Sequence, residues 1–390
     1  VGSLAVGPVM GLSASAAVEE FLTGFGATLK WIGVVLVLGA IIGELLEASG
    51  GVLRIADTVL RAVGRRRLPL AMGLTGYAVS IPAFVDVAYI MLKPVVEVLA
   101  ARSGRRVLVV GLSLTAGLTA THALLPPTPG PLATAAILGA SLGRVILINA
   151  VVAAFALGAG LLWATLYCRR FELDSDRTLH ARYAEASPPE RGGDVARPSA
   201  LASFAPILLP LVLIAAGSFV GEERTSAWAL ALRYAGTPLV ALLLGMVVAT
   251  LSLPRSGRLG RLRELTGRAI ERCAVVMMIT GAGGGLGGVI KASGVGDQIA
   301  GAFEGLALPG LLLPFLMAMA LTTATGSLTV AMVTSSAVVA PLLPTLGLSA
   351  EMAVALIGAG SLSIIHANSS FFWLLSRLHD VRPDVLYRTY

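Results

Sequence analysis

The chain has 390 residues, of which 56% are hydrophobic and only 13% charged, and its mean hydropathy is +0.85. A water-soluble domain usually carries about 25% charged residues, so this composition excludes a soluble globular protein and predicts a membrane protein. The net charge of +7 comes from basic residues that stand in blocks between apolar runs, so nucleic-acid binding is not expected. The two cysteines, Cys168 and Cys273, predict neither a disulfide framework nor a metal cluster, and no cofactor is expected.

Five apolar stretches are long enough to cross a hydrocarbon layer, which takes about 20 helical residues. We expect each of them to form an ordinary membrane-spanning helix. In chain order they cover residues 28–50, 145–168, 204–220, 228–252 and 273–294.

Four further apolar regions contain Gly, Pro or polar residues where an ordinary spanning helix would carry none. Irregular backbone at membrane depth is tolerated only where protein shields it or where it lines a wet cavity. The functional site is therefore expected in these interrupted regions, which cover residues 68–101, 107–142, 309–345 and 350–378.

A polar linker divides the chain into two halves that share landmarks. Ala48-Ser49-Gly50 recurs as Ala292-Ser293-Gly294, and His122 recurs as His366, both at a shift of 244 residues. Further landmarks recur in the same order, so we interpret the halves as an internal repeat. The expected division is a first repeat over 1–168, a cytoplasmic linker over 169–203 and a second repeat over 204–390.

The distribution of positive charge predicts the orientation of the chain. Five segments hold 23 of the 29 Lys and Arg residues and are assigned to the cytoplasm: 54–67, 102–106, 169–197, 255–272 and 377–388. Helix 28–50 must then run inward and its counterpart 273–294 outward. The expected fold is an all-α polytopic membrane protein with two inverted-topology repeats. Each repeat has a re-entrant hairpin (68–101 and 309–345) and a discontinuous helix (107–142 and 350–378), a pattern typical of secondary transporters.

The two repeats are not equally complete. The scaffold spans at 204–252 precede the second hairpin, whereas only Val1 to Leu12 stand in the corresponding place of the first repeat. The span at 145–168 likewise has no counterpart after the second repeat. We therefore expect the chain to lack scaffold helices at both ends.

The segment from Ala120 to Pro131 contains four prolines and one glycine. Proline removes amide donors and fixes φ, so this segment is expected to unwind within the membrane. The half-helix that begins near Gly130 would offer free amides and a positive dipole end to a carboxylate. His122, Thr128 and Gly130 are therefore candidate substrate-binding residues, and a simple kink is the alternative.

Two polar segments of the second repeat supply further candidates. The segment from His366 to Ser370 can offer hydroxyl and amide partners to a polyol, and the segment from Thr322 to Thr329 forms the expected tip of the second hairpin. Helix packing by small and polar residues is the alternative for both. The candidate substrate-binding residues are Thr325, Gly326, Ser327, Thr329, His366, Asn368, Ser369 and Ser370.

Asp86 is the only acid that we expect at membrane depth in the interrupted regions. A buried carboxylate is costly, so it is paired, protonated or functional. We favour proton coupling, and a structural pair with Lys93 is the alternative. The glycine-rich run from Gly281 to Gly288 has no preceding strand and no following GK[ST], so we interpret it as a helix-packing surface rather than a phosphate loop.

These motifs together resemble the gluconate permease family of proton symporters, within the ion transporter superfamily. The resemblance implies uptake of gluconate-like hydroxy acids with protons, elevator-type alternating access, a homodimer, and a multi-pass protein of the bacterial inner membrane. Asp86 stands where the family tends to have Glu, Thr128 stands where it tends to have a second His, and Ser369-Ser370 replace an Asp-Pro pair. The resemblance rests on Gly76–Asp86, His122–Pro131, Gly281–Gly284, Ser293–Asp297, Gly326–Ala331, Pro341, His366–Asn368 and Phe372–Trp373.

Three other functions fit part of the pattern. An intramembrane serine protease could use Ser327 and His366 as a dyad, but it would explain neither the repeat nor the proline-rich break, and no enzymatic activity is expected. A channel would share the re-entrant hairpins. A sodium-coupled di- or tricarboxylate carrier of the same superfamily is the alternative among transporters, because hairpin tips can bind Na⁺ through backbone carbonyls.

Overall fold

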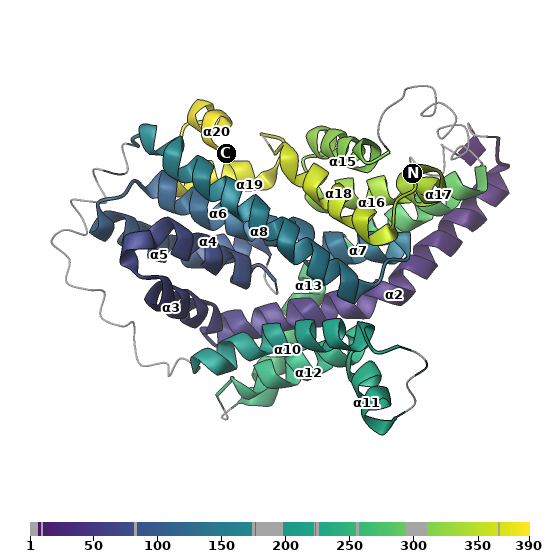
Figure 1. Ribbon diagram of the computed structural model, residues 1–390, viewed down its shortest axis with the longest axis horizontal. Coiled ribbons are helices and arrows are strands. Elements are labelled where there is room, and N and C mark those ends of the chain that lie inside the picture. Colours follow the sequence, from purple (N-terminus) through teal and green to yellow (C-terminus); the bar gives the residue numbers. More distant parts are fainter. Residues whose placement is uncertain are drawn as a thin grey trace.

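The computed structural model in Figure 1 describes residues 7–8, 11–81, 84–173, 176, 198–221, 223, 226–254, 257–293, 310–365 and 367–390. All regular elements among these residues are helices. Five of them are long and apolar enough to cross a membrane, and the count rises to seven if each of two bent helix pairs forms one span. The described part of the chain is therefore that of a polytopic membrane protein.

The first half of the chain forms the helices up to the linker. They are α2 (Ala14–Ala48), α3 (Gly51–Val63), η1 (Arg65–Arg67), α4 (Leu68–Val79), α5 (Val85–Ser103), α6 (Val107–Leu124), α7 (Pro129–Leu138), α8 (Leu142–Leu166) and η2 (Cys168–Arg170).

The second half forms the remaining helices. They are α10 (Ala200–Ser218), α11 (Ala227–Ala235), α12 (Pro238–Leu251), α13 (Arg258–Ser293), α15 (Leu312–Thr325), α16 (Leu328–Val339), η3 (Ala340–Leu342), α17 (Leu343–Leu346), α18 (Ala350–Ser363), α19 (Ser370–His379) and α20 (Pro383–Thr389).

The two longest helices, α2 and α13, pack side by side. They contain 35 and 36 residues, so each extends well beyond the spans predicted at 28–50 and 273–294. The residues before each predicted span, 14–27 and 258–272, are helical as well. Ser13 starts α2 by accepting a hydrogen bond from the Ala16 amide at 3.2 Å. At about 1.5 Å per residue, α13 is longer than the roughly 30 Å hydrocarbon layer, so its Arg-rich start reaches past the layer.

Ion pairs and small residues join α2 to α13. Arg272 pairs with Glu44, which is only 4% exposed, and lies 3.5 Å from Glu47. Further along α13, a Cβ on Gly284 would lie 2.7 Å from the Gly24 carbonyl oxygen, and one on Gly283 would collide with Val333 of α16. The glycine-rich run is thus a helix-packing surface, as the sequence indicates.

Helix ends fall within each of the four interrupted regions. The prolines between Leu124 and Pro131 remove amide donors, so α6 ends at Leu124 and α7 begins at Pro129; the Pro126–Pro127 bond is cis. In the second half, α18 ends at Ser363 and α19 begins at Ser370. The turn between α15 and α16 is at Gly326, whose φ of +70° favours glycine. The turn expected near Pro82 falls on residues 82–83, which lie outside the described residues.

The region 228–252 differs from the single straight span that we predict. It forms α11 and α12, which meet at an angle of 74°. Pro238 supplies no amide and begins α12, and a Cβ on Gly236 would lie 2.7 Å from the Cα of Gly217 on α10. The bend between α11 and α12 therefore lies where α10 packs closely against the chain.

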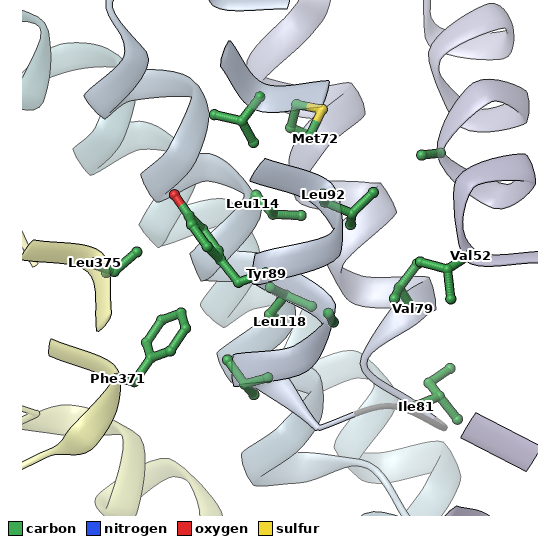
Figure 2. Close-up of a cluster of buried hydrophobic side chains, with 14 of the residues drawn as sticks. Val52, Met72, Val79, Ile81, Tyr89, Leu92, Leu114, Leu118, Phe371 and Leu375 are labelled. Atoms are coloured by element: carbon green, nitrogen blue, oxygen red, sulfur yellow. The ribbon is translucent and has the colours of Figure 1, made fainter. Parts of the chain in front are cut away.

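The largest hydrophobic core surrounds α5. Tyr89 is fully buried there, and its ring meets Phe371 of α19 edge to face at 5.6 Å between centroids. Figure 2 shows these two rings together with Leu114 and Leu118 of α6 and Met72 of α4. Residues from both halves of the chain thus hold the start of α5 in place, and Asp86 lies in its first turn.

Candidate functional site

A cavity of about 180 Å³ lies where the turn between α15 and α16, the start of α5 and the two helix breaks meet. This volume is far above the roughly 10–15 Å³ that one water needs. The cavity thus brings together residues from all four interrupted regions. Its lining consists of Phe84, Val85, Asp86, Thr119, His122, Gly326, Ser327, Leu328, Thr329, Ile365, Ser369, Ser370, Phe371 and Tyr390.

Three helices begin at the cavity wall. They are α5 at Val85, α16 at Leu328 and α19 at Ser370. The first amides of a helix have no partner within it and carry partial positive charge. Neither Phe84 nor Ser369 caps its helix with a side-chain hydrogen bond. Among the described lining residues none is Lys or Arg, so helix starts rather than basic side chains would attract an anion.

Asp86 is exposed to the cavity. It forms no hydrogen bond or ion pair with the described residues. Lys93, the alternative partner, instead places its Nζ 2.8 Å from Glu97 Oε1. The Asp86 carboxyl is therefore open to a proton or to a solute in the cavity.

His122 lies between the cavity and a smaller void of about 20 Å³ against α2 and α13. Pro127, Thr128 and Cys273 also line this void. The Nδ1 atom of His122 is buried and has no hydrogen-bond partner among the described residues. A solute or a water in either space could supply that partner.

Hydroxyl groups at the starts of α16 and α19 line the cavity. The Ser327 hydroxyl accepts a hydrogen bond from the Val330 amide at 3.4 Å. The hydroxyls of Thr329, Ser369 and Ser370 form no hydrogen bond with any described residue. These three groups are consequently available to a polar solute.

Two candidates from the first break lie outside the cavity wall. The Thr128 hydroxyl donates to the Leu125 carbonyl, and Thr128 lines only the smaller void. Gly130 is buried, and a Cβ there would lie 2.6 Å from the Met332 sulfur. Gly130 therefore lies at the contact between α7 and α16.

Two candidates from the second half, Thr325 and Asn368, also lie outside the cavity wall. Thr325 Oγ1 donates to the Leu321 carbonyl at 2.7 Å. Asn368 Nδ2 donates to the Thr323 carbonyl at 2.6 Å and to that of Thr322 at 3.4 Å, so it ties the second break to the end of α15. His366 lies outside the described residues.

Several residues that line the cavity are not among those predicted from the sequence. Thr119 could have been found, because it precedes His122 by three residues and so shares a face of α6. Phe371 directly follows Ser370, but its apolar side chain gives no functional signal. Tyr390 reaches the cavity because its ring packs beside Phe371, at 6.0 Å between centroids, a contact that depends on tertiary folding.

The helices and this cavity define a polytopic membrane protein with a polar internal site. The family model for GntP family permeases matches residues 1–387, and the chain belongs to this permease family. The resemblance to gluconate permeases is thereby confirmed, and the expectation of a permease rather than an enzyme agrees with it.

Curated relatives and solved structures support the assignment. The chain is 34% identical to a gluconate permease of Pseudomonas aeruginosa, over 99% of this chain and 86% of the relative. It is 32% identical to the Gnt-II system L-idonate transporter of Escherichia coli, over 99% of this chain and 87% of the relative. Its fold is similar to the YdaH transporter of Alcanivorax borkumensis, with a TM-score of 0.64 and 19% identity over 96% of this chain and 83% of the other.

Proposed function

We propose that this permease imports a small hydroxylated carboxylate of the gluconate class, together with protons, across the bacterial inner membrane. The observation that carries the proposal is the cavity into which three helix starts, three unbonded hydroxyls and one carboxyl converge. Relatives named as gluconate and L-idonate transporters support this class of substrate.

The polar groups of the cavity suit the two ends of a sugar acid. The starts of α16 and α19 present amides and the positive ends of helix dipoles, which favour a carboxylate. Thr329, Ser369 and Ser370 present hydroxyls that can both donate and accept hydrogen bonds, as the hydroxyl groups of a polyol do. A ligand that binds both the helix-start amides and the hydroxyls needs a carboxylate and hydroxyl groups. The cavity would therefore favour a sugar acid over a simple sugar or a simple fatty acid.

Asp86 supplies the proposed coupling to protons. An ionised Asp86 and a bound carboxylate would repel each other in the same cavity, whereas a protonated Asp86 would not. Each ligand therefore raises the affinity for the other, as thermodynamic linkage requires. Substrate and proton would bind and leave together, which is symport.

Alternating access by an elevator motion completes the proposal. In this mechanism α10 to α12, which are the scaffold spans predicted at 204–252, stay static together with α2 and α13, and the helices around the cavity move relative to them. The small residues where α13 meets α16 would allow such a displacement without large side chains in the way. The two inverted repeats and the homodimer implied by the resemblance belong to the same proposal.

Uptake by the purified protein in liposomes tests this function. A pH gradient and a Na⁺ gradient are imposed separately, and gluconate, idonate, simple sugars and dicarboxylates are supplied. We expect saturable accumulation of the sugar acids under the pH gradient. Accumulation that follows the Na⁺ gradient and ignores pH would refute proton symport and favour the sodium-coupled carrier.

A pair of serine variants tests the site. Ser370→Ala removes a hydroxyl that lines the cavity, and we expect KM for gluconate to rise about threefold to tenfold, since one hydrogen bond contributes roughly 0.5–1.5 kcal/mol. Ser363→Ala is the matched control, because the Ser363 hydroxyl is bonded to the Ala359 carbonyl at 2.9 Å and lies outside the lining. An unchanged KM in both variants would remove Ser370 from the site.

A further inference from the structure

A second, larger cavity lies away from the candidate site. It has a volume of about 830 Å³ and is enclosed by α2, α7, α8 and the helices α10 to α12. In Figure 1, α10, α11 and α12 lie on one side of α2, and α7 and α8 lie on the other. The cavity therefore separates two groups of helices.

The walls of this cavity combine apolar side chains with two basic residues. Val34, Leu132 and Ile214 are among the apolar residues, and Lys30 and Arg233 are the basic ones. Lys30 forms no ion pair or hydrogen bond with the described residues, although it stands within the 35-residue helix α2. An unpaired cation within a membrane helix is costly and commonly marks a binding site.

We propose that this cavity binds an anionic phospholipid, whose phosphate lies at Lys30 and whose acyl chain lies against Val34, Leu132 and Ile214. A lysine at such a place extends its ammonium toward the headgroup region while its stem stays in apolar surroundings. The orientation predicted by the basic segments places Lys30 and Arg233 toward the outer face. The lipid would thus belong to the outer leaflet.

Charge and shape together select this ligand. A soluble anion would gain from Lys30 but would leave the apolar walls facing water. A zwitterionic lipid would cover the walls and could bring its phosphate to Lys30, but its own ammonium group would compete with Lys30 for that phosphate and would be repelled by Arg233. An anionic phospholipid satisfies both, because juxtamembrane Lys and Arg residues each contribute about 1 kcal/mol to binding of anionic lipid.

Binding is tested on the delipidated protein in detergent by native mass spectrometry, with phosphatidylglycerol and phosphatidylethanolamine added separately. We expect phosphatidylglycerol to be retained more tightly, and Lys30→Gln to weaken its binding about fivefold, the factor that corresponds to one such contact. Lys291→Gln is the matched control, since Lys291 is a basic residue at the end of α13 that does not line this cavity. It should leave the affinity unchanged.

A second variant and a displacement assay test the same cavity. Ala140→Phe places a ring into the cavity and should reduce phosphatidylglycerol binding without removing Lys30. Equal retention of the two lipids, or equal effects of Lys30→Gln and Lys291→Gln, would overturn the proposal. Displacement of phosphatidylglycerol by inorganic phosphate or gluconate in the wild type would also overturn it, because the cavity would then be a site for soluble anions.

Discussion

Asp86 is the one carboxyl group among the described residues that line the cavity. It stands in the first turn of α5, beside the positive end of the helix dipole. A carboxylate substrate in the same space favours the protonated form. In the proposed symport, the balance between the helix dipole and a bound carboxylate would allow Asp86 to take up a proton with substrate and to release it afterwards.

Replacing Asp86 with Asn tests this balance. Asp86→Asn keeps the shape of the side chain but removes the titratable group, so we expect proton-driven accumulation of gluconate to be abolished while counterflow exchange continues. Glu351→Gln is the control, because Glu351 accepts a hydrogen bond from the Ser141 amide at 3.3 Å and lies outside the cavity. Normal accumulation by Asp86→Asn in liposomes with a pH gradient would contradict the assignment.

The residues that line the cavity differ in how far the sequence could predict them. Asp86, Ser327 and Ser369 were predictable because a polar residue beside a helix break is unusual in an apolar chain. The position of Asn368 outside the cavity wall could not be predicted. Its side-chain amide donates to a backbone carbonyl near the end of α15, 45 residues away in sequence. Which polar side chain faces a cavity and which ties two helices together depends on packing that a single sequence does not contain.

Glycines on both helices bring α4 and α6 into close contact. A Cβ on Gly117 of α6 would collide with the Gly73 carbonyl and lie 2.6 Å from the Tyr77 amide nitrogen, both on α4. A Cβ on Gly76 would likewise lie 2.8 Å from the Leu118 amide nitrogen. Backbone atoms cannot move aside as a flexible side chain can, so these glycines set the distance between the two helices.

Gly117→Ala is therefore expected to lower stability. Overpacking of this kind costs about 1–3 kcal/mol, which should appear as a lower melting temperature in detergent. Gly158→Ala is the matched control, because nothing lies within 4 Å of a Cβ at that position of α8 and alanine favours a helix by roughly 0.5–1 kcal/mol over glycine. Equal melting temperatures for the two variants would contradict the close contact of α4 and α6.

The helix ends themselves were partly predictable. Four prolines close together remove so many amide donors that a continuous helix across Ala120 to Pro131 is excluded by local chemistry alone. The bend between α11 and α12 was not predictable, because a single Pro238 is compatible with the first turn of a helix as well as with a kink. Its angle of 74° accompanies contact with α10, which is a tertiary feature.

The distribution of Lys and Arg predicts the orientation of the whole molecule across the membrane. Ser103, at the end of α5, is close to Arg102, Arg105 and Arg106, whereas Thr345 lies in a segment without Lys or Arg. The positive-inside rule therefore places Ser103 in the cytoplasm and Thr345 outside.

Thiol labelling checks this orientation. Cys168 and Cys273 are buried, so the wild type should react slowly with a membrane-impermeant maleimide. We expect Thr345→Cys to be labelled in intact spheroplasts, and Ser103→Cys to be labelled only after the membrane is opened. Labelling of both variants from outside, or the reverse pattern, would require another orientation.

We propose that the cavity formed by the starts of α5, α16 and α19 binds a sugar acid. A structure of the protein determined with gluconate in lipid nanodiscs tests it most directly. We predict ligand density in this cavity, with the carboxylate toward the starts of α16 and α19 and the hydroxyls within hydrogen-bonding distance of Thr329, Ser369 or Ser370. Gluconate density elsewhere in the molecule, with this cavity empty, would contradict the claim.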